Sequence, residues 1–203
     1  MGAQTLGMII ETLIYGPLKN NCYLVSCESS KEAVVIDPGG RSNNILRMIE
    51  QNSLTVKYIV NTHKHRDHTG VNGAVKEATG AVLAAGVRDA SDIKNPAVDR
   101  LLKEGDRIVF GDCALEVIET PGHTPGGICL YASGSSGSPG SVFTGDTLFH
   151  EDVGRTDLPG GDEAALHASI AKLLKLPEDT TVYPGHEEFS SIRHERLANP
   201  MKA

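Results

Sequence analysis

"NTHKHRDHTG", residues 61–70, crowds three histidines and one aspartate into six positions. The four side chains belong to His63, His65, Asp67 and His68. Imidazole and carboxylate groups this close together need a partner that shares their lone pairs, and a metal ion is such a partner. The run before them, "VKYIVNT" (residues 56–62), predicts a strand. The cluster therefore follows a strand end, where the binding residues of α/β proteins gather.

Three further predicted strands also run into a possible metal ligand. The pairs are residues 114–120 with His123, residues 142–149 with Asp146, and residues 180–187 with His186. Each ligand alone has an ordinary explanation, since most single histidines and Gly-Asp pairs are core, surface or turn residues. If each had only that ordinary explanation, the presence of a possible ligand at four separate strand ends would need four independent explanations. If the four strand ends meet at one edge, they form a single site.

Seven ligands exceed the four that a tetrahedral ion accepts, so we assign them to two ions. The first ion would be held by His63, His65 and His123. The second would be held by Asp67, His68 and His186. Asp146 would bridge the two ions and leave room for a bridging water. Three histidines stay outside these sets, and we expect a surface role for each: His150, His167 and His194.

The composition bounds the class of protein. The chain has 203 residues, of which 39% are hydrophobic and 22% charged, which is ordinary for a globular protein and favours one domain. The net charge of -7 argues against nucleic acid or an anionic membrane as the main partner. The N-terminus has no signal-peptide pattern, and no apolar run reaches the roughly 20 residues of a membrane span. We therefore expect a cytoplasmic protein, whose four cysteines are buried free thiols.

The remaining sequence alternates strand and helix signals. Further strands are predicted at residues 8–14, 21–27, 32–40, 81–85, 106–110 and 127–132. Helices are predicted at residues 42–52, 70–80, 161–176 and 191–197. The helix at 161–176 has Asp162 as its N-cap. The Gly- and Ser-rich stretch 133–141 predicts a flexible hairpin loop.

The pattern His63-Lys-His65-Arg-Asp67-His68 resembles the HxHxDH signature of the metallo-β-lactamase superfamily. The later stretches "PGHTPGG", "TGDTLF" and "YPGHE" are similar to its further motifs in order and spacing. The resemblance covers essentially the whole chain. It implies an α/β fold, an αββα sandwich with the metal site at one edge of the two β-sheets. It also implies that residues 1–203 form a single metallo-β-lactamase-like domain.

Within that superfamily the chain resembles the glyoxalase II-like hydrolases, of the single-domain bacterial hydroxyacylglutathione hydrolase type. The resemblance rests on "NCYLV", "VIDPGG", "GDTLF" and "GRTDLPGGD". Larger members carry a C-terminal helical domain that helps to bind glutathione, and we expect none here. Arg155 and Asp157 stand where those enzymes place a substrate-binding lysine and tyrosine. The resemblance therefore implies that Arg155 binds a substrate carboxylate, the alternative being a structural salt bridge in its loop.

The reaction implied is hydrolysis of a thioester, similar to S-D-lactoylglutathione, by attack of a metal-bound hydroxide. Asp67 would be a ligand and would also orient the water. The cofactors would be two divalent metal ions, zinc first, with iron or manganese as alternatives. The partner expected is a small-molecule thioester, with no nucleic acid and no membrane, and the protein would be a monomer or a homodimer.

Three alternatives remain open at this point. Persulfide dioxygenases also resemble the chain, and they use one iron held by the equivalents of His63, His123 and Asp146. A hydrolase of the same fold could act on another ester, a lactone, a β-lactam or a phosphoester. A metal-bound protein without catalysis would be a binding or scaffold module.

Overall fold

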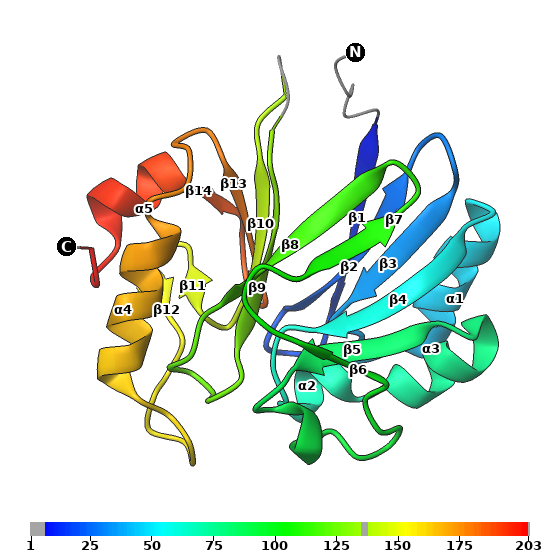
Figure 1. Cartoon of the computed structure of the whole chain (residues 1–203), viewed down its shortest axis with the longest axis horizontal. Coiled ribbons are helices and arrows are strands. Elements are labelled where there is room, and N and C mark those ends of the chain that lie inside the picture. Colours follow the sequence, from blue (N-terminus) through cyan, green and yellow to red (C-terminus); the bar gives the residue numbers. More distant parts are fainter. Residues whose placement is uncertain (1–6, 135–137, 203) are drawn as a thin grey trace.

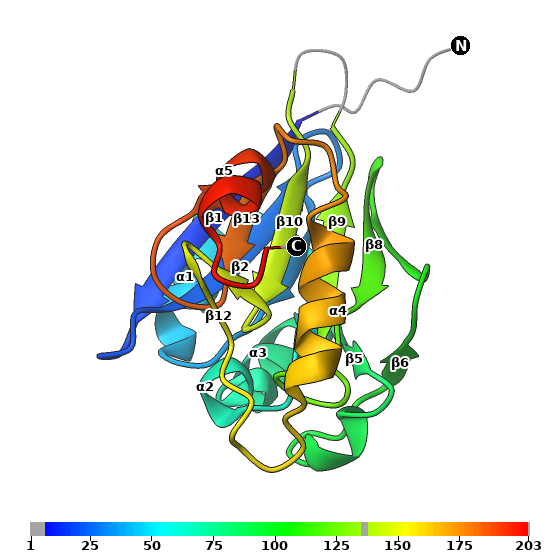
Figure 2. The same cartoon turned by 90° about the vertical axis from the view of Figure 1, so that its left-hand side faces the viewer.

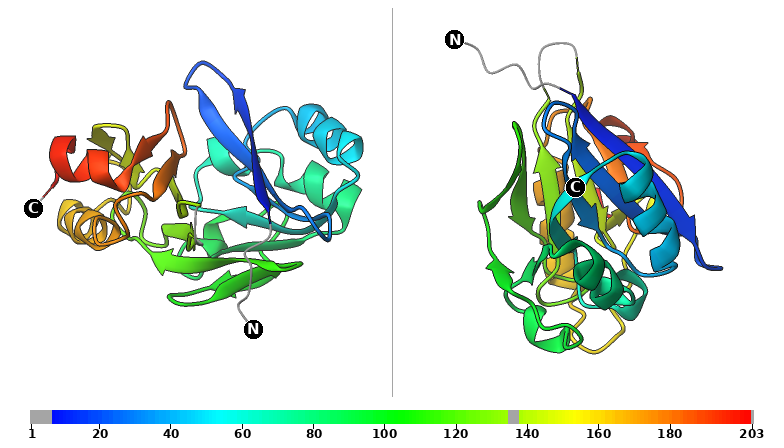
Figure 3. Two further views of the ribbon diagram at one scale, coloured as in Figure 1. Left: turned by 90° about the horizontal axis from the view of Figure 1, so that it is seen from above. Right: turned by 90° about the vertical axis from the view of Figure 1, so that its right-hand side faces the viewer.

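Two six-stranded sheets face each other, and helices cover the outer side of each (Figures 1 and 3). The computed structural model describes residues 7–134 and 138–202. Seen from above in Figure 3, α1 and α3 lie on one side of the paired sheets, and α4 and α5 lie on the other. The αββα sandwich implied by the family resemblance is confirmed.

The first sheet has the order β1-β2-β3-β4-β5-β6. Its strands are β1 (Met8–Tyr15), β2 (Asn20–Cys27), β3 (Glu32–Ile36), β4 (Thr55–Asn61), β5 (Val82–Gly86) and β6 (Arg100–Leu102). The strands β1 to β3 pair antiparallel, and β3 to β6 pair in parallel. Between them the chain forms α1 (Ser42–Gln51), α2 (Arg66–Thr69), α3 (Asn72–Thr79) and the short 3-10 helix η1 (Ala90–Asp92).

The second sheet has the order β14-β13-β10-β9-β8-β7. Its strands are β7 (Arg107–Phe110), β8 (Cys113–Glu119), β9 (Ile128–Ala132), β10 (Ser141–Gly145), β13 (Thr181–Pro184) and β14 (Ser190–Ser191). Only β10 and β13 pair in parallel within it. A separate two-stranded ribbon joins β11 (Leu148–Phe149) to β12 (Asp152–Val153). The helices α4 (Glu163–Leu173) and α5 (Ile192–Ala198) lie over this second sheet (Figure 2).

Three layers of apolar side chains hold the sandwich together. The middle layer lies between the sheets and contains Tyr23, Phe110 and Phe143, all fully buried. The second layer packs the buried face of α1, including Ile45, against the first sheet. The third packs α4, including Leu166, against the second sheet. Burial of apolar area on both faces of each sheet is the main driving force for this arrangement.

The long predicted elements are confirmed, most with shifts of one or two residues at their ends. The elements predicted at 32–40, 161–176 and 180–187 end three or four residues earlier, at Ile36, Leu173 and Pro184. The helix predicted at 70–80 is α3, and Gly80 ends it in the left-handed conformation (φ 70°). Asp162 is the N-cap of α4, where its Oδ1 accepts a hydrogen bond from Ala165 N at 2.9 Å. The strand predicted at 142–149 is in fact two, β10 and β11, because the chain turns where Thr147 N donates to Thr144 O.

The loop predicted at 133–141 connects β9 to β10, which pair antiparallel as a hairpin does. Its residues 135–137 lie outside the described part of the chain. All four cysteines are described, each is buried, and no disulfide joins them, as predicted. Among the described helices, none is at once long enough and apolar enough to cross a bilayer.

Candidate metal centre

Four strand ends carry the predicted ligands to one place. The loop after β4 carries the histidine cluster, and β4 belongs to the first sheet. The loops after β8, β10 and β13 carry His123, Asp146 and His186, and all three strands belong to the second sheet. The site therefore lies where the ends of both sheets meet, beside α2 in the lower part of Figure 1. The structure brings all seven predicted ligand residues together.

The first predicted group, His63, His65 and His123, comes together with one ligand atom of each within 4.8 Å of the others. His65 Nδ1 and His123 Nε2 lie 2.9 Å apart, and the two rings are nearly perpendicular, at 82°. His63 Nε2 is buried and has no hydrogen-bond partner among the described residues. A buried ring nitrogen without a partner is costly unless something else binds it.

The second predicted group, Asp67, His68 and His186, is equally close. His68 Nε2 lies 3.2 Å from His186 Nε2, which in turn lies 3.5 Å from Asp67 Oδ2. Asn20 Nδ2 donates to the same Asp67 oxygen at 2.9 Å and fixes the carboxylate. The group spans both sheets, since Asp67 and His68 lie in α2, which follows β4, and His186 follows β13.

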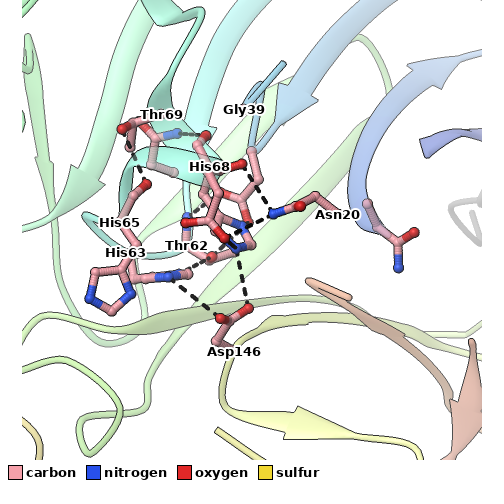
Figure 4. Close-up of polar contacts among 12 residues, drawn as sticks. Asn20, Gly39, Thr62, His63, His65, His68, Thr69 and Asp146 are labelled. Carbon is pink, nitrogen blue, oxygen red and sulfur yellow. Dashed lines mark hydrogen bonds and ion pairs between the residues drawn. The ribbon is translucent and has the colours of Figure 1, made fainter. Parts of the chain in front are cut away.

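Asp146 lies between the two groups. Its Oδ2 is 3.5 Å from His123 Nε2 and 3.4 Å from His186 Nε2, and its Oδ1 is 3.3 Å from His68 Nε2. Figure 4 shows this carboxylate facing the rings of His63 and His68. Asp146 Oδ1 is itself buried without a hydrogen-bond partner among the described residues. Its place between both groups is the one that a bridging carboxylate would need.

Four of the five rings are turned by a contact to the nitrogen that points away from the centre. His123 Nδ1 lies 2.8 Å from Arg155 O, and His186 Nδ1 lies 2.9 Å from Leu18 O. Each of these rings therefore donates its Nδ1–H to a backbone carbonyl, and Nε2 is the nitrogen that faces the centre. His63 and His68 are held at Nδ1 by Thr62 Oγ1 and Asp37 Oδ2, each at 3.1 Å. Such outward contacts are the usual support of metal-binding imidazoles.

Asp37 is a supporting residue that the sequence analysis missed. Its carboxylate accepts from Thr62 N at 2.8 Å and from Thr62 Oγ1 at 2.6 Å, besides contacting His68. It is 1% exposed and has a positive φ of 53°, which costs free energy for a non-glycine residue. A signal was present, because Asp37 ends the buried strand in "VIDPGG" just as the ligands end theirs.

Asp89 is a second supporting residue without such a signal. It is fully buried, and its carboxylate accepts from Lys64 N, Thr124 Oγ1 and Gly126 N at 3.1, 2.6 and 2.8 Å. It thereby ties the loop of the histidine cluster to the loop of His123. It lies beside η1 in a segment without a periodic pattern, so no feature of the sequence pointed to it.

Two glycines allow the backbone to pass close to the ligands. A Cβ at Gly39 would overlap the backbone carbonyl of Asp67 and the Tyr15 hydroxyl. A Cβ at Gly185 would overlap the Asp146 carboxylate and the His68 ring. Tyr15 Oη, which accepts from Gly39 N and donates to Asp37 O, braces the same turn.

In the first group, the surroundings favour neutral imidazoles. Burial, together with the neighbouring ring of His68, lowers the pKa of His63 well below its usual value. Burial and the ring of His123 also lower the pKa of His65. A neutral imidazole with a free lone pair is the form that binds a metal ion.

In the second group, the neighbouring carboxylates favour protonated imidazoles. Burial opposes a charge on His68, but Asp146 and Asp37 outweigh it and raise the pKa of that ring well above its usual value. Burial likewise opposes a charge on His186, but hydrogen bonds to Asp146 and Asp67 raise its pKa to about 10. Without metal, protons on these rings would neutralise the carboxylates. A divalent cation can take the place of those protons.

The donor set fits two metal ions. Ligands of a tetrahedral ion with bonds of roughly 2.0–2.1 Å lie about 3.4 Å apart, and the contacts within both groups cluster around that separation. Nitrogen atoms of two rings that approach each other to 2.9 Å cannot both be satisfied as acceptors without a proton or a cation between them. The clusters are suited to a binuclear metal site, and Asp146 contacts rings of both groups.

A cavity of about 600 Å³ opens beside the centre. Five of the ligand residues reach it: His65, Asp67, His123, Asp146 and His186. Its apolar lining consists of Leu18, Phe149, Val153 and Leu158. Two arginines, Arg66 and Arg155, lie at its wall. A cavity of this size suits a small organic ligand.

The predicted substrate-binding residue, Arg155, lines the cavity but is already paired. Its Nε and Nη2 donate to the two carboxylate oxygens of Asp157 at 2.6 and 2.7 Å. This is the structural salt bridge named as its alternative role. Substrate binding by Arg155 stays a prediction. Arg66, which the sequence analysis did not select, also lines the cavity, and its guanidinium has no hydrogen-bond or ion-pair partner among the described residues.

The three histidines expected to stay outside the centre do so. His167 is exposed on α4. His150 and His194 also lie away from the centre, although their rings stack on each other.

Comparison with known proteins agrees with this geometry. The family model described as "Metallo-beta-lactamase superfamily" matches residues 15–186. A protein named hydroxyacylglutathione hydrolase from Rhodospirillum rubrum is 40% identical over 168 residues, which are 83% of this chain and 62% of that relative. The chain thus spans less than two thirds of that relative's length.

Two solved structures are similar over almost the whole chain. ETHE1 from Myxococcus xanthus superposes with a TM-score of 0.85 and 32% identity, covering 95% of this chain and 84% of that one. TTHA1623, solved in a di-iron-bound form, superposes with a TM-score of 0.78 and 33% identity, covering 94% and 98%.

Proposed function

Because the chain belongs to the metallo-beta-lactamase superfamily, we propose that it is a hydrolase that uses a two-metal centre to cleave thioesters similar to S-D-lactoylglutathione. The observation that carries the proposal is the position of Asp146. Its carboxylate contacts the rings of both ligand groups and also reaches the cavity. A substrate in the cavity would therefore meet both metal positions at once.

Residues His63, His65, Asp67, His68, His123, Asp146 and His186 would hold the two ions. When bound, the ions would lower the pKa of a water molecule and polarise the thioester carbonyl. Asp67, fixed by Asn20 at 2.9 Å and half-exposed to the cavity, would orient the water for attack on the carbonyl carbon. A thiolate leaves readily, so the chain need supply no strong acid to the departing sulfur.

The walls of the cavity would select the substrate. The apolar side chains of Phe149 and Leu158 offer a surface for the acyl and thiol parts. Arg66 offers an unpaired cation for a carboxylate of the thiol carrier. Arg155 could take part through Nη1, because its pair with Asp157 occupies only Nε and Nη2. The printed name of the Rhodospirillum relative supports a glutathione thioester as the first substrate to test.

The second candidate is a mononuclear iron persulfide dioxygenase. The fold match to ETHE1 from Myxococcus xanthus favours it. In that reaction His63, His123 and Asp146 would hold the iron on a two-histidine, one-carboxylate face, which leaves positions open for O₂.

Turnover of S-D-lactoylglutathione by the metal-loaded protein tests the proposal. We expect hydrolysis that is lost in His68→Ala, with His167→Ala as the matched control that keeps full activity because that ring is exposed on α4. An inert wild-type protein that instead consumes oxygen with glutathione persulfide would reject the thioesterase and establish the dioxygenase.

A further inference from the structure

A second cluster of metal-binding side chains lies outside the centre. His150 and Glu151 occupy the turn between β11 and β12, Glu188 follows β13, and His194 lies in α5. One ligand atom from each of His150, Glu151 and His194 lies within 4.8 Å of the other two. The cluster therefore joins the β11–β12 turn to residues 188–194, which lie almost 40 positions later in the sequence.

The two rings are paired with each other and with the glutamates. Their centroids are 4.8 Å apart and their planes differ by only 14°. His194 Nε2 lies 2.9 Å from Glu151 Oε1, and His150 Nδ1 lies 3.4 Å from Glu188 Oε1. The stacked rings would repel each other if both were protonated. Neutral rings that share a cation with the carboxylates would not.

The charge around the cluster favours a cation. Two carboxylates contact the rings, and a third, that of Glu195, accepts hydrogen bonds from Glu151 N at 3.2 and 3.3 Å. No lysine or arginine is paired with Glu151, Glu188 or Glu195 among the described residues. A divalent ion would offset this local negative charge.

The backbone under the cluster is held firmly. Glu151 has a positive φ of 57°, and its N–H is bound by the buried Glu195 carboxylate. Asn199 Nδ2 donates to Asp152 O at 3.1 Å and fastens the same turn to α5. The side chains themselves are partly exposed, His150 by 30% and His194 by 41%. Small side-chain rotations can therefore bring the ligand atoms from their present spacing to the roughly 3.4 Å of a tetrahedral ion.

We propose that His150, Glu151 and His194 bind a further divalent cation, with Glu188 as the fourth ligand. Two imidazoles and two carboxylates suit zinc or a neighbouring borderline ion such as cobalt or nickel. The ion fastens the β11–β12 turn to α5 and to the segment after β13. The ion would thereby connect two segments that line the cavity. Phe149 and Glu187 line it, and they are the chain neighbours of His150 and Glu188. The site is independent of the thioesterase proposal.

The test is the number of zinc equivalents bound at equilibrium dialysis against buffered zinc, measured by metal analysis. We expect the wild-type protein to hold one equivalent more than the His150→Gln/His194→Gln variant. His167→Gln, which changes an exposed histidine of α4 in the same way, should bind as the wild type does. Equal zinc content in the wild type and the double variant overturns the proposal.

A second double variant controls for the possibility that the first one misfolds. Glu151→Gln/Glu188→Gln keeps both rings and removes the two carboxylates, and we expect it to lose the same equivalent. Circular dichroism should show unchanged secondary structure in both double variants. Thioester turnover should persist in both, whereas zinc added to the wild type should raise its melting temperature further than it raises theirs. An equal rise in all three proteins would also contradict the site.

Discussion

The orientation of most histidines at the centre is set by a contact to the ring nitrogen that points away from the centre. A backbone carbonyl fixes the tautomer of His123 and of His186, and Asp37 holds His68. A few residues that are not ligands therefore control the orientation of the ligand rings.

Replacing Asp146 by asparagine should disturb both ions at once. The amide keeps one oxygen but turns the other contact into a donor, which repels a cation. We expect lower content of both metals and a loss of turnover on the order of 100-fold or more. Metal analysis and kinetics measure the two effects, and full stoichiometry in Asp146→Asn would reject the bridging role.

Replacing Asp37 by asparagine should act through His68. The variant keeps the size of the side chain but removes the negative charge of the carboxylate. That carboxylate contacts the His68 ring and accepts two hydrogen bonds from Thr62. We expect metal affinity or activity to fall by roughly 10–100-fold. Chelator competition measures the affinity. Asp112→Asn, at an exposed turn far from the centre, is the matched control, and an equal effect in both variants would contradict the assignment.

Replacing Arg66 by glutamine should affect binding rather than chemistry. If the guanidinium pairs with a substrate carboxylate, KM should rise about tenfold for an anionic thioester, since a charged hydrogen bond contributes about 1.5–3 kcal/mol. The value of kcat should stay close to wild type. Arg47→Gln, on the exposed side of α1, should change neither constant. A change confined to kcat in Arg66→Gln would point away from substrate binding.

Among the elements, α4 supports the loop that presents His123. Ser169 Oγ donates to Pro121 O at 2.7 Å, and Asp162 N donates to Gly122 O at 2.8 Å. Gly122 has a φ of 142°, and a Cβ there would overlap the backbone of Leu166. The start of the helix and the ligand loop are thus packed as one unit.

Removing the cap of α4 should lower stability. Asp162→Ala loses the hydrogen bond from Ala165 N, which costs about 1 kcal/mol. For a protein of this size the melting temperature should fall by roughly 2–4 °C. Asp162→Asn can still cap the helix and should stay near wild type. An equal fall in both variants would mean that the carboxylate matters for its charge and not for the cap.

The sequence predicted the elements whose signal is local. The helix α3 and strands such as β4 have periodic patterns and end signals of their own, and the structure confirms them. The short strands β6, β12 and β14 have two or three residues each, so only pairing with a partner defines them. Asp89 was missed for the same reason, because its role exists only once two distant loops lie side by side.

Across the whole molecule, the centre joins the two sheets. Local patterns could not assign β4 to one sheet and β8, β10 and β13 to the other, and the family resemblance was needed for the sandwich. Yet the rule that ligands follow strand ends did predict their convergence at one edge. The buried carboxylates and rings that converge there are stabilised by whatever cation they bind.

Chelation should therefore weaken the entire fold. An ion at a free concentration 100 times its Kd stabilises by about 2.7 kcal/mol, and its removal should lower the melting temperature by roughly 5–10 °C. Differential scanning calorimetry with and without chelator measures the shift, and adding zinc back should restore it. Equal melting temperatures in the two states would show that the centre holds no ion tightly.

The wide sequence separation of the ligands sets an order of events during protein synthesis. The first sheet is complete once Leu102 has been made. However, His123 is made 58 residues after its partner His65, and His186 is made 118 residues after its partner His68. A growing chain can thus present the histidine cluster long before it can offer either ion a full set of ligands. Tight uptake of both ions would then mark a chain whose translation has passed residue 186.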